Sequence, residues 1–349
     1  MQNIAIDLFC GIGGLTKGLS LAGINVIAGF DIDESCEFAY EKNNNAKFIN
    51  KDINDITSEE INQFFREQNG AKIIVGCAPC QPFSRYSLRY RKEGRTDDKW
   101  RLLYSFSRLV RECIPEIVSM ENVPSLTNEN VFRDFVQQLK ELDYYVDWKI
   151  VYCPDYGVPQ KRKRLVLLAS RLGEIQLIPP LYSKGKYKTV RLAIGELPPI
   201  SDGEICKTDS LHRSSKLSKT NRERIGQSIP GGTWRDWDEK LKVSCHNKKS
   251  GLTYPSVYGR MKWDEPSPTI TTQFYGYGNG RFGHPEQNRA ISLREGAILQ
   301  SFPNDYIFID ERHPAKKREL GIHIGNAVPV ELGRAIGISI QRHLQEYGG

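Results

Sequence analysis

The stretch GCAPCQPFS at residues 76–84 holds the residues whose types and spacing most directly suggest chemistry. Cys77 and Cys80 stand three positions apart, and Pro79 and Pro82 stiffen the backbone around Cys80. A metal site would need further ligands, but the sequence has no second C-x-x-C and no H-x-x-x-H. A redox pair would need a helix N-terminus in a thioredoxin-like setting, which the two prolines disfavour. Two interpretations of this stretch remain, a structural turn and the site of a nucleophile, and no metal is expected.

The elements around this stretch predict an α/β protein. The first half of the chain alternates continuously apolar runs with segments of helical spacing, as expected when both faces of a parallel sheet are covered. Such alternation predicts a doubly wound, Rossmann-like sheet whose ligands bind at the carboxyl ends of the strands. Cys80 follows the fourth strand and should lie at that edge. The predicted strands are 4–9, 25–31, a short third strand before Asp52, 72–77, 116–120 and 164–170, and the predicted helices are 14–23, 34–43, 100–113, 131–142 and 331–344.

The positive charge of the chain is concentrated in one segment. Residues 1–180 contain 23 Lys and Arg against 24 Asp and Glu, residues 181–290 contain 19 against 11, and residues 291–349 contain 7 against 7. Residues 181–290 are also rich in Pro, Gly and Lys and lack clear periodicity. We therefore expect one domain formed by 1–180 and 291–349, and a second, smaller, loop-rich domain at 181–290 that binds a polyanion such as nucleic acid.

Membrane and disulfide-rich classes are disfavoured. The chain has no apolar run near the ~20 residues that cross a bilayer. Its N-terminus, MQNIAIDLFC, lacks the pattern of a signal peptide. We expect a cytosolic protein, in which the eight cysteines do not form a disulfide framework. Most of them, Cys77 included, are interpreted as small buried hydrophobic residues.

Three positions at predicted strand ends favour an adenosine-type cofactor. The glycines of DLFCGIGG at 7–14 let a ligand approach the backbone and the following helix N-terminus, although their spacing is not G-x-G-x-x-G. Asp31 ends the second strand, where it could bind ribose hydroxyls or cap a helix. Asp52 follows the third strand, where an adenine amino group could be read.

Six motifs in this order resemble those of the DNA cytosine-5 methyltransferases of bacterial type. They are DLFCGIGG (7–14), P-C-Q (79–81), ENV (121–123), Q-x-R-x-R (160–164), ISLREGAILQSFP (291–303) and GNAVP (325–329). The resemblance covers nearly the whole chain outside 181–290. It implies the sheet of an S-adenosylmethionine-dependent methyltransferase, transfer of a methyl group from S-adenosyl-L-methionine to C5 of cytosine, and S-adenosyl-L-homocysteine as product. Residues 181–290 fall where the family has its target-recognition domain.

The resemblance also implies a cofactor pocket. The family more often has Glu at the position of Asp31 and a bulkier residue at that of Ile32, so details of these contacts can differ here. The implied cofactor-binding residues are Phe9, Gly11, Ile12, Gly13, Gly14, Asp31, Ile32, Asp52, Ile53, Pro79, Leu102, Asn326 and Val328.

The residue types fit this reaction. Carbon 5 of cytosine is a poor nucleophile, but a thiolate that adds to C6 turns C5 into an enamine carbon able to attack a methylsulfonium. The resemblance makes Cys80 this nucleophile, activated by nearby positive charge or a dipole. Glu121 can protonate or hydrogen-bond N3 of the ring. Arg162 and Arg164 can grip O2 of the base or a phosphate, although without the motif they would be interpreted as a solvated strand edge.

A cytosine inside a duplex must be flipped out to reach such a pocket. Residues 84–101, SRYSLRYRKEGRTDDKWR, interleave basic and aromatic side chains and predict a mobile loop that closes over DNA; an Arg-rich surface loop is the alternative. Within 181–290, stretches such as GGTWRDW offer side chains that can contact phosphates and base edges. The residues expected to contact DNA are Gln81, Ser84, Arg85, Ser87, Arg235, Arg260 and Lys262.

Two rival functions remain open. One is cytosine-5 methylation of transfer RNA, which the sizeable recognition segment disfavours. The other is sequence-specific DNA binding without catalysis, which the intact Cys80, Glu121 and Q-x-R-x-R motif disfavour. We expect a monomeric bacterial or phage enzyme of a restriction-modification system. Its partner is a specific sequence in double-stranded DNA, with no stable complex with a cognate restriction endonuclease.

Overall fold

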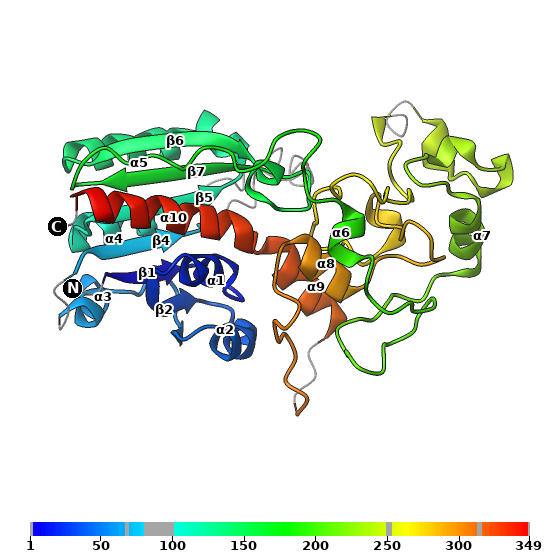
Figure 1. The fold of residues 1–349 in the computed structure, drawn as a ribbon, viewed down its shortest axis with the longest axis horizontal. Helices are drawn as coiled ribbons and strands as arrows, with labels where there is room; N and C mark the ends of the chain where they lie inside the picture. The colour runs from blue at the N-terminus through cyan, green and yellow to red at the C-terminus, as the bar shows by residue number, and fades with distance from the viewer. Residues whose placement is uncertain (1–2, 67–69, 80–100, 249–252, 313–315, 348–349) are drawn as a thin grey trace. The chain divides into compact units, whose positions relative to one another are not determined.

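The computed structural model describes residues 3–66, 70–79, 101–248, 253–312 and 316–347 (Figure 1). The chain divides into two compact units. The first unit contains Met1–Tyr156, Lys163–Leu181 and Val328–Gly349, and the second contains Gly157–Arg162 and Tyr182–Ala327. The second unit thus extends beyond residue 290, where the sequence analysis ended the second domain, because residues 291–327 pack within it.

A seven-stranded sheet forms the centre of the first unit, in the order β3-β2-β1-β4-β5-β7-β6. Strands β1 to β5 pair in parallel, whereas β7 runs antiparallel to both β5 and β6. The predicted α/β class is confirmed, but the sheet is mixed rather than wholly parallel. The strands are β1 (Ile4–Leu8), β2 (Asn25–Asp31), β3 (Lys47–Asn50), β4 (Lys72–Gly76), β5 (Ile117–Asn122), β6 (Tyr145–Tyr152) and β7 (Lys163–Ser170).

Helices cover both faces of this sheet (Figure 1). Helices α3, α4 and α5 pack on one face, where the core includes Ile6, Ile74, Phe106 and Phe135. Helices α1, α2 and α10 belong to the other face, where α1 packs against both β2 and α10. The bounds are α1 (Gly14–Leu21), α2 (Glu37–Asn43), α3 (Ser58–Phe65), α4 (Arg101–Cys113), α5 (Asn130–Glu141) and α10 (Val330–Tyr347), with 3-10 turns η1 (Glu34–Cys36), η4 (Pro124–Asn128) and η5 (Cys153–Tyr156).

The contact between α1 and α10 depends on glycine. A Cβ atom at Gly18 would lie 2.4 Å from the carbonyl oxygen of Val330 and 2.5 Å from the amide nitrogen of Arg334. A Cβ atom at Gly333 would lie 3.1 Å from the carbonyl oxygen of Leu15. The backbones of the two helices therefore touch, which fixes α1, and the loop that precedes it, against the C-terminal helix.

Strand β1 contains a buried carboxyl group. Asp7 of β1 is 1 % exposed, and its Oδ2 accepts a hydrogen bond of 2.7 Å from the hydroxyl of Thr16. The Thr16 hydroxyl also lies 3.2 Å from that of Tyr40 on α2. Burial raises the pKa of Asp7 from 3.8 to about 7, and the nearby Asp31 carboxylate contributes to the increase. Asp7 is therefore protonated in the folded protein over a pH range in which it is ionised in the unfolded chain.

The second unit has little regular structure. Strand pairing among its described residues is limited to isolated bridges such as Pro230↔Arg260. Its helix α8 packs against α6 and α9, and begins with a capping box formed by Ser292 and Glu295. Glu295 also binds Arg289 at 2.7 Å, with both side chains 1 % exposed. The helices are α6 (Val190–Ile194), α7 (Lys219–Gln227), α8 (Leu293–Leu299) and α9 (Lys317–Asn326), with 3-10 turns η6 (Trp234–Asp236), η7 (Glu239–Leu241), η8 (Ser244–Asn247) and η10 (Tyr277–Asn279).

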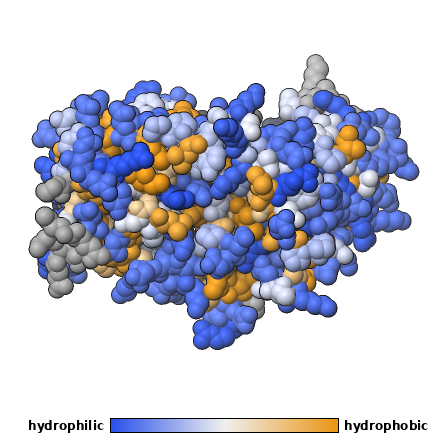
Figure 2. All heavy atoms as spheres, in the orientation of Figure 1, coloured by the Kyte–Doolittle hydropathy of each residue, from blue (hydrophilic) through white to orange (hydrophobic). Residues whose placement is uncertain are grey.

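The surface of the second unit is mostly hydrophilic on the face seen in Figure 2. Its large aromatic residues instead pack inward, where Trp234 and Trp237 are each 4 % exposed. The ring of His246 stacks on that of Trp234, with 4.3 Å between the centroids. Among the described residues, no helix has both the length and the apolar character needed to cross a bilayer.

We predict that Gly18→Ala lowers the free energy of unfolding by about 1–3 kcal/mol, because one of the two helices must move to admit the methyl group. Urea denaturation followed by circular dichroism measures the change. Gly226→Ala in α7 is the matched control, since a Cβ atom there meets no atom within 4 Å. It should be neutral or stabilising by up to about 1 kcal/mol. Equal urea midpoints for Gly18→Ala and the wild type would contradict the packing described here.

We predict that Asp7→Asn becomes progressively more stable relative to the wild type as pH rises from about 4 to about 7. In this range the folded wild type keeps the Asp7 proton that the unfolded chain releases, so its stability falls by up to about 1.4 kcal/mol per pH unit. An asparagine still accepts the Thr16 hydrogen bond but does not ionise. The measurement is the difference in unfolding free energy at several pH values, with the exposed Asp55→Asn as control. A difference that does not change with pH refutes the assignment.

Candidate active site

The loop after β1 has an unusual backbone. Gly11 and Gly13 have φ angles of +49° and +82°, and Phe9, a residue that rarely adopts this conformation, has a φ of +63°. Gly13 caps α1, which begins at the buried Gly14, and Ile12 is 3 % exposed. The loop therefore turns sharply from β1 into α1, and strain of this kind is often found at binding sites.

Asp31 lies beside this loop, at the carboxyl end of β2. Its Oδ2 accepts a hydrogen bond of 2.8 Å from the amide of Gly11, and its Oδ1 accepts one of 3.0 Å from the amide of Asp33. The carboxylate is thereby held in one orientation while remaining partly exposed. The next side chain, Ile32, is 68 % exposed, although it is apolar. An oriented carboxylate and an exposed apolar side chain thus occupy neighbouring positions at the sheet edge.

The other expected cofactor residues of the first unit lie in or near the ends of β3 and β4. Oδ1 of Asp52 accepts hydrogen bonds from the amide and the side chain of Asn54, at 2.9 and 2.8 Å. Ile53 is 5 % exposed in the sheet core, and Leu102 of α4 packs against the same core. Pro79 is exposed beyond β4. Because β3, β2, β1 and β4 are parallel neighbours, their carboxyl ends form one edge.

Hydrogen bonds join the segment that follows β4 to its neighbours β1 and β5. The amide of Cys77 donates to the carbonyl of Leu8 at 3.3 Å, which continues the pairing of β4 with β1. The side-chain amide of Asn122 donates to the carbonyl of Ala78 at 3.0 Å. The backbone that leads to the predicted nucleophile is thus fixed as far as Ala78. Five predicted residues lie outside the described part of the chain, namely Cys80, Gln81, Ser84, Arg85 and Ser87, as does most of the predicted mobile loop.

Glu121 is the buried acidic group of this edge, with 2 % exposure. Its Oε1 lies 2.7 Å from Nε of Arg164, and its Oε2 accepts a hydrogen bond of 2.9 Å from the thiol of Cys77. Glu121 pairs with Val166 across the antiparallel ladder, so Arg164, two residues away on the same face, is its diagonal neighbour. The structure therefore brings Glu121 and Arg164 into contact with each other and adds Cys77, which the sequence analysis interpreted as a small buried hydrophobic residue.

Arg162, the other arginine of the Q-x-R-x-R motif, belongs to the second unit and is 4 % exposed. Its guanidinium donates to the carbonyl oxygens of Ile270 at 3.0 Å and Gly325 at 3.5 Å. Gln160 binds the same segment, since its Oε1 accepts from the amide of Ile270 at 2.8 Å. This geometry gives Arg162 a role in holding the loops of the second unit.

The GNAVP motif joins α9 to α10. Asn326 is exposed at the C-terminal end of α9, in the second unit, and Val328 is 5 % exposed just before α10, in the first. Gly325 allows a close backbone contact, because a Cβ atom there would lie 2.5 Å from the carbonyl carbon of Thr271. The motif therefore places a polar side chain at the end of α9 next to a tightly packed turn.

The three expected DNA contacts that lie in the described second unit differ in exposure. Arg235 is exposed, with its guanidinium 5.3 Å from the ring centroid of Trp234. Lys262 is exposed and pairs with Glu265 at 2.8 Å. Arg260 is 4 % exposed, and its burial does not fit a direct DNA contact.

Arg260 instead joins loops of the second unit. Its Nε donates to the carbonyl of Ser228, its Nη1 to that of His284 and its Nη2 to that of Ile225, each at 2.8 Å. A buried guanidinium offers five donors, and here they satisfy backbone carbonyl groups that no sheet pairs. The sequence alone gives no signal that separates this arginine from exposed ones.

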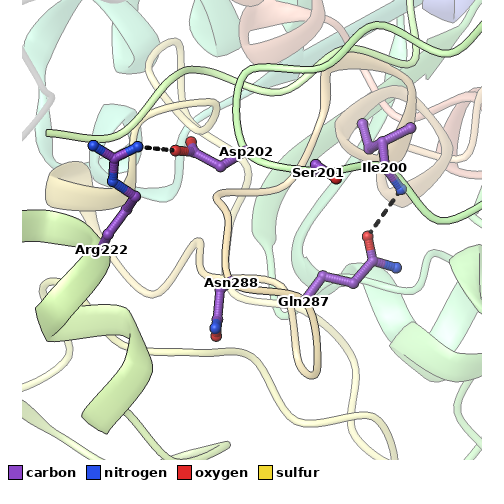
Figure 3. A pocket seen from close by; sticks show the side chains of 6 residues that line it. All are labelled: Ile200, Ser201, Asp202, Arg222, Gln287 and Asn288. Atoms are coloured by element: carbon purple, nitrogen blue, oxygen red, sulfur yellow. Dashed lines mark hydrogen bonds and ion pairs between the residues drawn. The ribbon is translucent and has the colours of Figure 1, made fainter. Parts of the chain in front are cut away.

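A cavity of about 400 Å³ lies in the second unit (Figure 3). Asp202 and Arg222 face each other across it, with 3.7 Å between Oδ2 and Nη1. The amide of Ile200 donates to the side chain of Gln287 at 3.2 Å. None of the expected active-site residues that the structure describes lines this cavity. Its lining residues are Ile200, Ser201, Asp202, Arg222, Gln287 and Asn288.

The chain is similar in sequence to known proteins. Residues 4–342 match the family described as C-5 cytosine-specific DNA methylase. The chain is 53 % identical over 348 residues to the type II methylase M.HgiDII of Herpetosiphon aurantiacus, covering 99 % of this chain and 97 % of the relative. It is 33 % identical over 357 residues to the type II methyltransferase M1.BsuMI of Bacillus subtilis, covering 96 % and 79 % of the two chains.

A solved structure shows the same fold. It is that of an Escherichia coli prophage protein described as a DNA modification methyltransferase, with a TM-score of 0.75 and 23 % sequence identity. The match covers 99 % of this chain and 100 % of the other. The family match spans nearly the whole sequence and includes the elements that carry Asp31, Glu121 and Arg164. The chain therefore belongs to the C-5 cytosine-specific DNA methylases, and it is a DNA cytosine-5 methyltransferase.

Proposed function

We propose that this enzyme transfers a methyl group from S-adenosyl-L-methionine to C5 of a flipped-out cytosine in a specific duplex DNA sequence, through a covalent bond between Cys80 and C6. The observation that carries the proposal is the buried Glu121 held by Arg164 at the carboxyl edge of the sheet. This pair lies next to the end of β4, from which the chain leads to Cys80, and β4 in turn pairs with the strand that precedes the glycine loop.

The residues at the ends of β1 and β2 fit the methyl donor. The Asp31 carboxylate is already oriented by two backbone amides, and each of its oxygens can accept a further hydrogen bond from a ribose hydroxyl. The exposed Ile32 side chain would lose contact with water by covering the adenine. S-adenosyl-L-methionine supplies an electrophilic methyl group. We propose that the remaining contacts come from Phe9, Gly11, Ile12, Gly13, Gly14, Asp52, Ile53, Pro79, Leu102, Asn326 and Val328.

The base is activated by residues at the ends of β4 and β5. The Cys80 thiolate adds to C6 of the cytosine, and the protonated carboxyl of Glu121 gives its proton to N3, which neutralises the negative charge that the addition places on the ring. Arg164 fixes the Glu121 carboxyl and places positive charge beside it. The electron pair at C5 would then take the methyl group, and S-adenosyl-L-homocysteine would leave. A base such as a water molecule takes the C5 proton, the C5–C6 double bond forms again, and Cys80 leaves as the thiolate. The proton on N3 returns to Glu121.

The second unit supplies recognition in this proposal. Residues 181–290 hold the excess of basic residues, and Arg235 and Lys262 are among the exposed ones. The proposed partner is double-stranded DNA, which places the enzyme in the cytoplasm of a bacterial host. The relatives named as type II enzymes support a role in a restriction-modification system. There a cognate endonuclease would act on the same sequence without forming a stable complex.

We predict that the purified protein transfers the labelled methyl group of S-adenosyl-L-methionine to duplex DNA and not to transfer RNA. Cys80→Ser should abolish turnover while leaving S-adenosyl-L-methionine affinity within about twofold, because it removes only the nucleophile. Bisulfite sequencing of DNA from a host that expresses the protein identifies the methylated sequence. Duplex DNA with 5-fluorocytosine in that sequence should form a covalent complex with the wild type and none with Cys80→Ser. Methylation without any such complex refutes the covalent mechanism, and methylation of transfer RNA alone refutes the DNA assignment.

We predict that Asp31→Ala weakens S-adenosyl-L-methionine binding by at least about tenfold, because charge-assisted hydrogen bonds to the ribose are lost. Isothermal titration calorimetry measures the affinity. Asp31→Asn can still accept the Gly11 hydrogen bond, so it separates loss of charge from collapse of the loop. Asp55→Ala, an exposed carboxylate beyond β3, is the matched control and should bind normally. Wild-type affinity in both Asp31 variants would remove this residue from the proposed site.

A further inference from the structure

We propose that Cys77 is a positioning residue, whose thiol holds the carboxyl group of Glu121 in the orientation that serves the target base. This inference rests on the proposed function, because it concerns the group assigned to N3 of cytosine. The thiol donates to Oε2 of Glu121 at 2.9 Å. It therefore contacts the proposed catalytic carboxyl directly, and it stands three residues before the proposed nucleophile.

The sheet register makes this contact. Gly76 of β4 pairs in parallel with Met120 of β5. The residues that follow them, Cys77 and Glu121, therefore lie side by side. Neighbouring residues in register on parallel strands point to the same face of a sheet. The amide of Cys77 bonds to Leu8 on the other side, which prevents the chain from turning away at this point. The thiol and the carboxyl are thus brought together by backbone pairing.

The two oxygens of Glu121 are held from different directions. Arg164 reaches Oε1 from β7, and Cys77 reaches Oε2 from the end of β4. One contact alone would let the carboxyl turn about its bond to the side chain, whereas two contacts to different oxygens fix its plane. The Cys77 and Arg164 contacts each use one lone pair of an oxygen, so a second lone pair on each oxygen remains to carry the proton that N3 receives. Glu121 is 2 % exposed, which leaves little room for water to replace a lost donor.

The Cys77 thiol also links Glu121 to the segment between β4 and Cys80. The Cys77 contact joins the carboxyl to the end of β4, and the Asn122 side chain joins β5 to Ala78, the next residue. A displacement of the segment before Cys80 would therefore move Glu121 as well. An apolar filler of the same size would lack this link.

The test compares Cys77→Ala, which removes the donor, with Cys77→Ser, which keeps one. Cys77→Ala should lower kcat for DNA methylation by about tenfold, the effect of one lost hydrogen bond, with KM for S-adenosyl-L-methionine unchanged. Cys77→Ser should restore kcat to within about threefold of the wild type. Cys113→Ala is the matched control, a buried cysteine of α4 far along the chain from the motif, and it should change stability without changing kcat. Melting temperatures establish that each variant is folded.

A double-mutant cycle separates positioning from packing. If Cys77 acts through Glu121, adding Cys77→Ala to Glu121→Ala should change the residual single-turnover rate by less than about twofold. An additional tenfold loss in that background overturns the inference, as does a kcat of Cys77→Ala equal to that of the wild type. Failure of Cys77→Ser to exceed Cys77→Ala also overturns it. Failure of the proposed function is distinguishable, because then the wild type itself transfers no methyl group to DNA and the inference falls with it.

Discussion

The parallel pairing of β4 between β1 and β5 is the constraint on which the site depends. Parallel strands end at the same edge, so residues far apart in the sequence meet there because their strands are paired. The glycine loop follows β1, Cys77 follows β4 and Glu121 ends β5. The pairing continues beyond the strands through the amide of Cys77 and the side chain of Asn122. Backbone hydrogen bonds thereby define the spacing between the proposed cofactor site and the proposed base site.

The antiparallel strand β7 contributes to the same edge from the opposite direction. Because β7 runs against β5, its beginning lies where the parallel strands end. Arg164, the second residue of β7, therefore reaches Glu121, the second-last residue of β5. A parallel strand at this place would have carried an arginine at its start to the far edge of the sheet. The reversal of one strand explains how a motif at a strand start can serve the site.

The sequence predicted the strands that are covered on both faces of the sheet. Strands β1, β2, β4, β5 and β7 are mainly apolar because both faces of the sheet are covered, and this pattern can be recognised without a structure. Strand β6 was missed because it lies at the edge, where its side chains alternate between polar and apolar and only Val151 is buried. The six motifs indicated the family and named Glu121 and Arg164 as site residues, but the ion pair between them was not predicted. The contact of Cys77 with Glu121 depends on register, which no single stretch of sequence contains.

The basic segment illustrates a second limit of sequence reasoning. Composition counts Arg260 equally with Arg235, yet burial gives them different physical roles. Arg260 donates to the backbone carbonyls of Ser228 and Ile225, so it supports the loops of the unit. Lys262 is exposed but paired with Glu265, and an exposed pair of this kind costs little to break. In the recognition proposed for this unit, direct contacts to DNA come from fewer side chains than the net charge suggests, and specificity depends on how the loops present them.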